Sequence, residues 1–203
     1  MQRRLNMPLS ETQDLLDRKF DVCFTHADVN GNGVLEQADV LALAARVATY
    51  LGEPMGSSKT QKLFQTFEDF WTHVQAKMNV DNDGQVTPEE WRNGLKSFAE
   101  DSEAYKAGFH PLAKAIFTIC DRDDNGSLEQ SEFAKFHQAF GCKAANSQLA
   151  FQKLDSNGNG QLTVDELLIA WQEYYTSSDQ NAGGNWLYGD VWDNTVVVGS
   201  KTR

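Results

Sequence analysis

Oxygen-bearing side chains recur in the same order in four twelve-residue segments of this 203-residue chain. Each segment has Asp or Asn at positions 1, 3 and 5, Gly at position 6, an aliphatic residue at position 8 and a carboxylate at position 12. The segments cover residues 28–39, 79–90, 121–132 and 155–166 and are called loops I to IV below. Alternate oxygen ligands on a tightly wound loop suit a hard divalent cation such as Ca²⁺, which takes about six to eight of them.

The acidic side chains gather in these loops. The 48 loop residues hold 15 of the 29 acidic side chains and one base, Arg122, which gives a net charge of −14. The other 155 residues carry 14 acids and 17 bases, so the net charge of the whole chain is −11. Such an acidic chain, with no basic run longer than two residues, does not suit a phosphate backbone, and we expect no nucleic-acid partner. The charge predicts calcium ions as partners instead.

The predicted ligands in each loop are the side chains at positions 1, 3, 5, 9 and 12 and the main-chain carbonyl at position 7. Glycine at position 6 allows the sharp turn that aims them inward. In loops I and II the candidates are Asp28, Asn30, Asn32, Val34, Glu36, Asp39, Asn79, Asp81, Asp83, Gln85, Thr87 and Glu90. In loops III and IV they are Asp121, Asp123, Asn125, Ser127, Glu129, Glu132, Asp155, Asn157, Asn159, Gln161, Thr163 and Glu166.

This spacing is that of the EF-hand calcium loop. A surface loop rich in Asx–Gly turns would account for any one segment, but not for the shared residues at positions 8 and 12 in all four. We therefore predict a calcium-binding protein. An enzyme is not expected, because no nucleophile–base motif surrounds the four histidines, and the carboxylate pairs Glu89–Glu90 and Asp165–Glu166 lie at the ends of calcium loops.

Two loops depart from the common pattern. Loop I closes with Asp39, whose side chain is one methylene shorter than Glu, so we expect it to accept six-coordination and to bind Mg²⁺ better than the other loops do. Loop II begins with Asn79 where the others begin with Asp, which removes one charge from the site. Either loop II binds a fourth ion, or it stays empty and supports loop I as its partner. Three or four bound ions therefore remain open.

Apolar residues at helical spacing precede and follow every loop, which predicts eight helices. Paired EF-hand loops meet at position 8, so we expect antiparallel bridges from Leu35 to Val86 and from Leu128 to Leu162. The predicted fold class is all-α, with four EF-hands in two pairs packed into one compact globule. Short two-stranded β-bridges are expected between the paired loops.

The chain is predicted to divide into two pairs and a tail. The N-terminal pair covers residues 9–99, the C-terminal pair residues 100–176, and the tail residues 177–203. Residues 99–110 form a short connection with Tyr105 and Phe109, which favours two halves packed face to face. We expect the Trp and Tyr residues of segment 183–192 to dock on the core.

The layout resembles the sarcoplasmic calcium-binding proteins and their bacterial calerythrin-like relatives. The features that carry this resemblance are the long helix before loop II, Asp39, Asn79 and the sequence from Gly183 to Gly189. It covers the chain from about Leu9 to Trp192. The resemblance implies a compact calcium buffer or transporter with sites I, III and IV active and site II commonly inactive. Loop II keeps Glu90 here, which departs from an inactive loop.

Three functions fit these features. The first is a calcium buffer or transporter whose folding is coupled to metal binding, since empty acidic loops repel one another. The second is a calcium sensor that exposes an apolar surface to a protein target, although the four methionines form no groove-like cluster. The third is binding of an apolar ligand of the coelenterazine type, because the same fold serves photoproteins with His-Trp-Tyr groupings. The chain matches them incompletely, with His73 near Trp71 and Trp171 near Tyr174.

The remaining features concern the cellular setting. No apolar stretch approaches the roughly 20 residues of a spanning helix, and no apolar segment follows Arg3 and Arg4, so we expect neither membrane insertion nor secretion. The three cysteines form no CxxC pair and are odd in number, which argues against disulfides and zinc. We expect a cytoplasmic monomer, with the question of a protein target left open.

Overall fold

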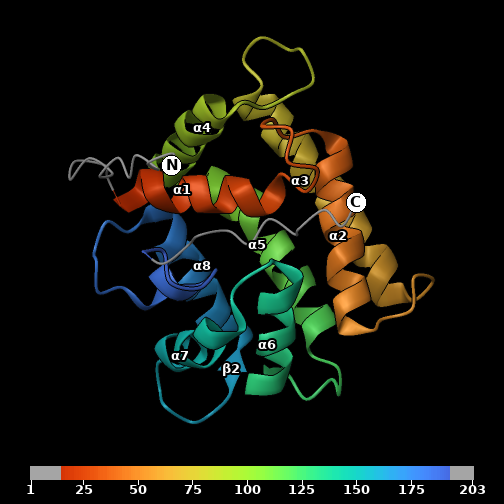
Figure 1. Cartoon of the computed structure of the whole chain (residues 1–203), viewed down its shortest axis with the longest axis vertical. Helices are drawn as coiled ribbons and strands as arrows, with labels where there is room; N and C mark the ends of the chain where they lie inside the picture. Colours follow the sequence, from red (N-terminus) through yellow and green to blue (C-terminus); the bar gives the residue numbers. More distant parts are fainter. Residues whose placement is uncertain (1–14, 193–203) are drawn as a thin grey trace, which may run out of the picture.

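Each predicted loop lies between two helices in the computed structural model, which describes residues 15–192 (Figure 1). The helices that precede the loops are α1 (Leu15–Ala27), α3 (Ser58–Met78), α5 (Ser102–Cys120) and α7 (Ala144–Leu154). Those that follow the loops are α2 (Gln37–Leu51), α4 (Pro88–Glu100), α6 (Gln130–Ala139) and α8 (Val164–Thr176). A short 3-10 helix, η1 (Gly183–Trp186), comes after α8. The predicted all-α class is confirmed. The expected pair boundary at residue 9 and the end of the tail, residues 193–203, lie outside the described residues.

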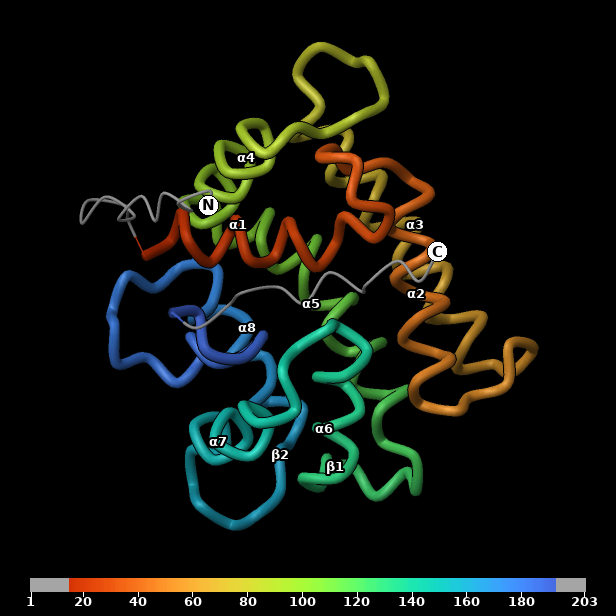
Figure 2. Tube along the Cα trace, viewed as in Figure 1, coloured from red at the N-terminus to blue at the C-terminus, as the bar shows by residue number. Residues whose placement is uncertain are grey.

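The loops meet in pairs at two opposite ends of the chain trace (Figure 2). In the N-terminal pair, Leu35 and Val86 exchange two main-chain hydrogen bonds of 2.9 Å across an isolated antiparallel bridge. In the C-terminal pair, β1 (Ser127–Leu128) and β2 (Leu162–Thr163) form a two-stranded antiparallel sheet in which Leu128 faces Leu162. Both bridges predicted from position 8 are therefore confirmed.

The connection between the halves is shorter than the sequence predicted. α4 ends at Glu100 and α5 begins at Ser102, so Asp101 alone separates them. Of the residues expected to form a connection, 99–100 end α4 and 102–110 form the first turns of α5. Asp101 caps α5 by accepting a hydrogen bond of 3.0 Å from the Ala104 N–H. Pro111 lies inside α5 without ending it.

Aromatic side chains from both halves fill one continuous core. Phe109 of α5 lies 5.2 Å from Phe70 of α3 and 4.6 Å from Tyr175 of α8, measured between ring centroids. α1 lies between α4 and α8 (Figure 1), and the Tyr174 hydroxyl of α8 donates to the Lys19 carbonyl oxygen of α1 at 2.7 Å. The apolar face of each pair is thus covered by the other pair, which gives the compact body that was predicted.

The segment after α8 packs closely against the fourth hand. A Cβ atom at Gly183 would come within 2.6 Å of the Lys153 carbonyl oxygen, and one at Gly184 within 2.4 Å of the Ala170 carbonyl oxygen. Only glycine allows this approach to α7 and α8. Leu187 and Tyr188, which follow, are buried in the core.

The helices between residues 15 and 192 include none that is both long enough and apolar enough to cross a bilayer.

Candidate calcium sites

Loop III brings three predicted ligands together. One carboxylate oxygen each from Asp121, Asp123 and Glu132 lies within 4.8 Å of the others. Asp121 also holds the loop in shape, because its Oδ1 accepts from the Asn125 N–H at 3.1 Å and its Oδ2 from the Gly126 N–H at 3.0 Å. The donor set is all oxygen, which fits a hard cation such as Ca²⁺.

The carboxylate at position 12 connects every loop to its following helix. It accepts a hydrogen bond from the main-chain N–H of position 9 in all four loops, at 2.9–3.2 Å, and so caps the helix that begins there. In loop III the other oxygen of Glu132 accepts from the Arg122 N–H at 2.9 Å, which turns this carboxylate across the loop. The same side chain therefore serves as a cap and as a candidate ligand.

Loop IV follows the same plan. Asp155 accepts from the Asn159 and Gly160 N–H groups at 3.2 and 2.8 Å. Glu166 accepts from the Thr163 hydroxyl and N–H, from the Ser156 hydroxyl and from the amide nitrogen of the Asn157 side chain. Burial alone would raise the pKa of Glu166, but these hydrogen bonds together lower it, so the carboxylate stays ionised.

Loop I differs in how its shorter closing residue is placed. Asp39 is 1% exposed, and its Oδ1 accepts from the Asn30 N–H at 3.2 Å, one position further along the loop than the contact Glu132 makes. Asp28 accepts from the Gly31, Asn32 and Gly33 N–H groups at 2.8–3.2 Å. The side chain at position 1 is therefore hydrogen-bonded to the loop backbone as in loops III and IV, and the closing carboxylate of Asp39 is buried.

Loop II has the same backbone shape but lacks one contact. Position 6, Gly84, has φ +87°, within the range of +81° to +89° found at Gly33, Gly126 and Gly160. Glu90 accepts from the Val80 and Thr87 N–H groups at 3.0 and 2.9 Å, as Glu132 does in loop III. Asn79 differs, because its Oδ1 is buried and has no hydrogen-bond partner. The loop is closed at its end but not tied at its start.

Loop II also contacts a candidate ligand of loop I. The Gln85 side-chain amide donates to Glu36 Oε1 at 2.8 Å. Glu36 occupies position 9 of loop I, so loop II forms a hydrogen bond with a side-chain oxygen that is a predicted calcium ligand of loop I. No pattern in the sequence predicts this contact, since position 7 was expected to act through its main-chain carbonyl only.

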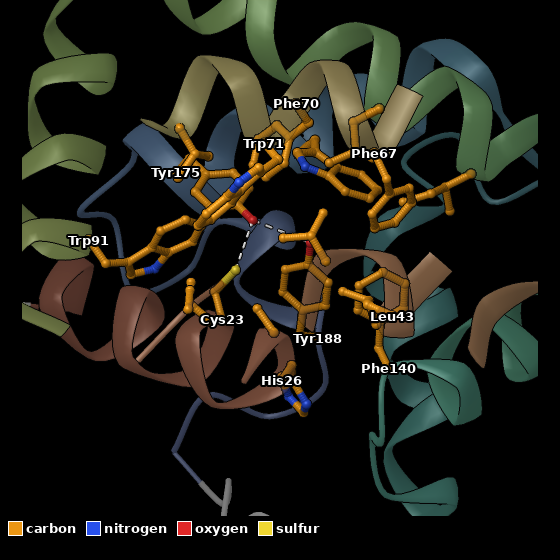
Figure 3. A pocket seen from close by; sticks show the side chains of 17 residues that line it. Cys23, His26, Leu43, Phe67, Phe70, Trp71, Trp91, Phe140, Tyr175 and Tyr188 are labelled. Carbon is orange, nitrogen blue, oxygen red and sulfur yellow. Dashed lines mark hydrogen bonds between the residues drawn. The ribbon is translucent and has the colours of Figure 1, made fainter. Parts of the chain in front are cut away.

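A small apolar cavity lies at the centre of the core (Figure 3). Its volume is about 40 Å³, and side chains from α1 to α5, from α8 and from the tail line it. The Cys23 thiol lies 3.1 Å from the Tyr175 hydroxyl, which in turn lies 3.3 Å from the Tyr188 hydroxyl. His26 lines this cavity, whereas His73, which the sequence placed beside Trp71, is exposed. The expected grouping of His73 with Trp71 is thus not formed there.

Comparison with known proteins defines the class. The family described as "EF-hand domain pair" matches residues 109–172, and that described as "EF hand" matches residues 80–96. With the fold and loops above, this makes the chain a calcium-binding EF-hand protein. As expected, it is not an enzyme, since the EF-hand fold is not catalytic.

Within that class the chain is similar to calerythrin, and it shares its fold with a sarcoplasmic calcium-binding protein. It is 29% identical to calerythrin from Saccharopolyspora erythraea over 83% of its own length and 94% of the relative's. It is 25% identical to the luciferin-binding protein of Renilla reniformis over 86% and 93% of the two lengths. The solved structure of a sarcoplasmic calcium-binding protein from amphioxus shares the fold, with a TM-score of 0.72 at 16% identity over 87% of this chain and 97% of that chain.

Proposed function

We propose that this protein is a cytoplasmic, monomeric calcium buffer or transporter with three principal sites, in loops I, III and IV. The support is that their first carboxylates, Asp28, Asp121 and Asp155, each accept hydrogen bonds from the N–H groups of positions 5 and 6. The ligands proposed are those predicted above at positions 1, 3, 5, 7, 9 and 12. Loop II is proposed to stay empty at micromolar Ca²⁺, because Asn79 lacks both the charge and these contacts.

The two units proposed are a pair over residues 9–99 and a pair over residues 100–176, each binding through its bridged loops. Segment 183–192 is proposed to remain docked in the calcium-bound form. A calorimetric titration should then give three ions per chain. Two or fewer would contradict the assignment of loops I, III and IV.

The observation that favours a buffer over a sensor is the covered apolar face of each pair. Sensors expose a groove to their targets when calcium binds. Here Phe109 of the C-terminal pair packs on Phe70 of the N-terminal pair, and the Tyr174 hydroxyl donates to the Lys19 carbonyl oxygen of α1 at 2.7 Å, so each pair occupies the other's apolar face. Met78 is buried rather than part of a surface groove. The chain itself fills the position that a target would take.

Binding of an apolar dye such as ANS distinguishes the two functions. A buffer whose core tightens with metal should bind less dye in calcium than in chelator, with a stronger near-ultraviolet circular dichroism signal in calcium. A sensor should bind more dye in calcium. An increase in dye fluorescence on adding calcium would therefore overturn the proposed buffer.

The central cavity favours a second candidate, the binding of an apolar ligand. One relative is named for luciferin binding, and the Cys23, Tyr175 and Tyr188 side chains offer polar contacts inside an apolar space. A volume of about 40 Å³ is far below the roughly 300 Å³ of a typical small-molecule pocket, so the core would have to expand. Quenching of tryptophan fluorescence by coelenterazine, saturable at one ligand per chain, would support this candidate. If the fluorescence shows no saturable change, the ligand-binding candidate is rejected and the calcium buffer is the only proposed function.

A further inference from the structure

A lysine of the N-terminal half reaches across to loop III. The Lys59 ammonium, at the start of α3, donates to the Asp121 main-chain carbonyl oxygen at 2.8 Å. It also forms an ion pair of 2.6 Å with Asp124 Oδ1. Lys59 comes just after the connection between α2 and α3. Figure 2 shows this connection on the same side of the molecule as loop III. These contacts join residues that are 62 and 65 positions apart in the sequence.

The position of Lys59 in its own helix does not explain its side-chain placement. It is the second residue of α3, where the positive end of the helix dipole disfavours a cation. Ser57 already caps this helix by accepting from the Thr60 N–H. The Lys59 side chain is only 22% exposed, so it is held against loop III rather than extended into solvent. Its favourable contacts come from the other half of the molecule.

The partners of Lys59 lie beside the predicted ligands without being the same groups. Asp124 occupies position 4 of loop III, which is not a ligand position, and has φ +54°. Asp121 occupies position 1, where its side-chain carboxylate is the candidate ligand and its main-chain carbonyl bonds Lys59. Loop III holds five carboxylates and Arg122. The ammonium therefore adds positive charge at the entrance of a strongly acidic loop.

We propose that Lys59 lowers the calcium affinity of loop III, because its positively charged ammonium group is held beside that loop. This inference rests on the proposed binding of calcium at loop III. The ammonium neutralises Asp124 and repels the arriving dication, so loop III binds calcium more weakly than its carboxylates alone would allow. The N-terminal half thereby adjusts a site of the C-terminal half.

Nuclear magnetic resonance can follow each loop separately. The Gly126 N–H donates to Asp121 Oδ2 at 3.0 Å, so its ¹H–¹⁵N signal reports on the occupancy of loop III during a calcium titration. The K59M variant keeps most of the side-chain volume and removes the charge. We expect its calcium concentration at half-saturation of Gly126 to fall roughly threefold to tenfold at low salt, from removal of one repulsive charge. The Gly160 signal of loop IV should shift much less.

Two controls separate charge from structure. Lys62→Met removes the same charge one turn further along α3, where the side chain is exposed, and should leave Gly126 within about twofold of wild type. Lys59→Arg keeps the charge and should also behave as wild type. The K59M effect should shrink between about 0.02 M and about 0.5 M KCl, because salt screens charges at this exposure.

The outcomes distinguish the two proposals. A Gly126 signal that does not respond to calcium in the wild-type protein contradicts the proposed site in loop III. A normal Gly126 titration that is unchanged or weaker in K59M contradicts the role of Lys59 alone. D124N tests the anchor independently: in that background K59M should change the affinity by clearly less than in the wild-type background, because only the Asp121 main-chain carbonyl oxygen still holds the ammonium at the loop. An undiminished K59M effect there would overturn the role of Asp124.

Discussion

The two pairs of hands share a backbone plan but differ in how their loops are tied. In the C-terminal pair, two-residue strands join loops III and IV, and Asp121 and Asp155 each accept from two loop N–H groups. In the N-terminal pair, a single bridge joins the loops and Asn79 makes no such contact through its Oδ1. Loop II nevertheless has the glycine conformation and the closing carboxylate contacts of the others. A loop can therefore have the EF-hand backbone shape without having its position-1 side chain hydrogen-bonded as in the loops expected to bind calcium.

The closing carboxylates should reveal the largest difference between the halves. Glu132→Gln removes a charged, potentially bidentate ligand from a tied loop, and we expect the calcium affinity of loop III to fall by about a hundredfold or more. Glu90→Gln makes the same change in loop II and should leave three bound ions with unchanged affinities. Calorimetry of both variants checks this. A loss of one tight ion in E90Q would show that loop II binds as the other loops do.

Restoring the first carboxylate should convert loop II. Asn79→Asp adds a charge and a second carboxylate oxygen at position 1 of loop II, where the Asp83 N–H now donates to Asp81 Oδ1 at 3.2 Å. We expect loop II to gain at least about thirtyfold in affinity and a fourth ion. Asn82→Asp adds the same charge at position 4, which is not a ligand position, and serves as the matched control. Equal gains in both variants would mean that charge, and not the contact at position 1, separates loop II from the other loops.

The core does not share this difference between the halves. His26 comes from the N-terminal pair and His137 from the C-terminal pair, and burial lowers the pKa of each to about 4. The His137 Nε2 atom lies 3.2 Å from the Leu187 carbonyl oxygen. The His137 Nδ1 atom has no hydrogen-bond partner, so a proton added there would have no acceptor. Both halves of the core therefore favour neutral histidine.

Acid should destabilise the metal-free protein through these histidines. The unfolded chain takes up a proton near pH 6.5 and the folded protein only near pH 4, so this stability is complete above pH 6.5 and is lost as the pH falls between those values. From pH 7.0 to 5.5, we expect each histidine to cost about 1 kcal/mol of unfolding free energy. Urea unfolding in chelator should show a smaller loss for His137→Gln. The exposed His73→Gln variant should match wild type, and a wild-type loss in H137Q would contradict this assignment.

The sequence predicted what depends on local spacing. The four loops, the helices beside them and both position-8 bridges follow from positions within twelve residues, where residue type and backbone shape are directly coupled. The contacts of Lys59 with loop III and of Gln85 with Glu36 join distant segments, and no periodic pattern marks them. His26 was missed as a cavity residue for the same reason, because which histidine faces the core depends on how the two pairs pack.

Exchanging the closing residues of loops I and III should give the smallest effect and test metal choice. Asp39 is buried and accepts from the Asn30 N–H, whereas Glu132 accepts from the Arg122 N–H one position earlier, so the two closing carboxylates contact different positions of their loops. We expect Asp39→Glu to weaken Mg²⁺ competition at loop I roughly fivefold, because a longer carboxylate favours the higher coordination of Ca²⁺. Glu132→Asp should strengthen Mg²⁺ competition at loop III by a similar factor. Titrations in millimolar Mg²⁺, followed at the Gly33 and Gly126 amides, measure both. If the two substitutions moved competition in the same direction, side-chain length would not be what distinguishes loop I from the loops of the C-terminal pair.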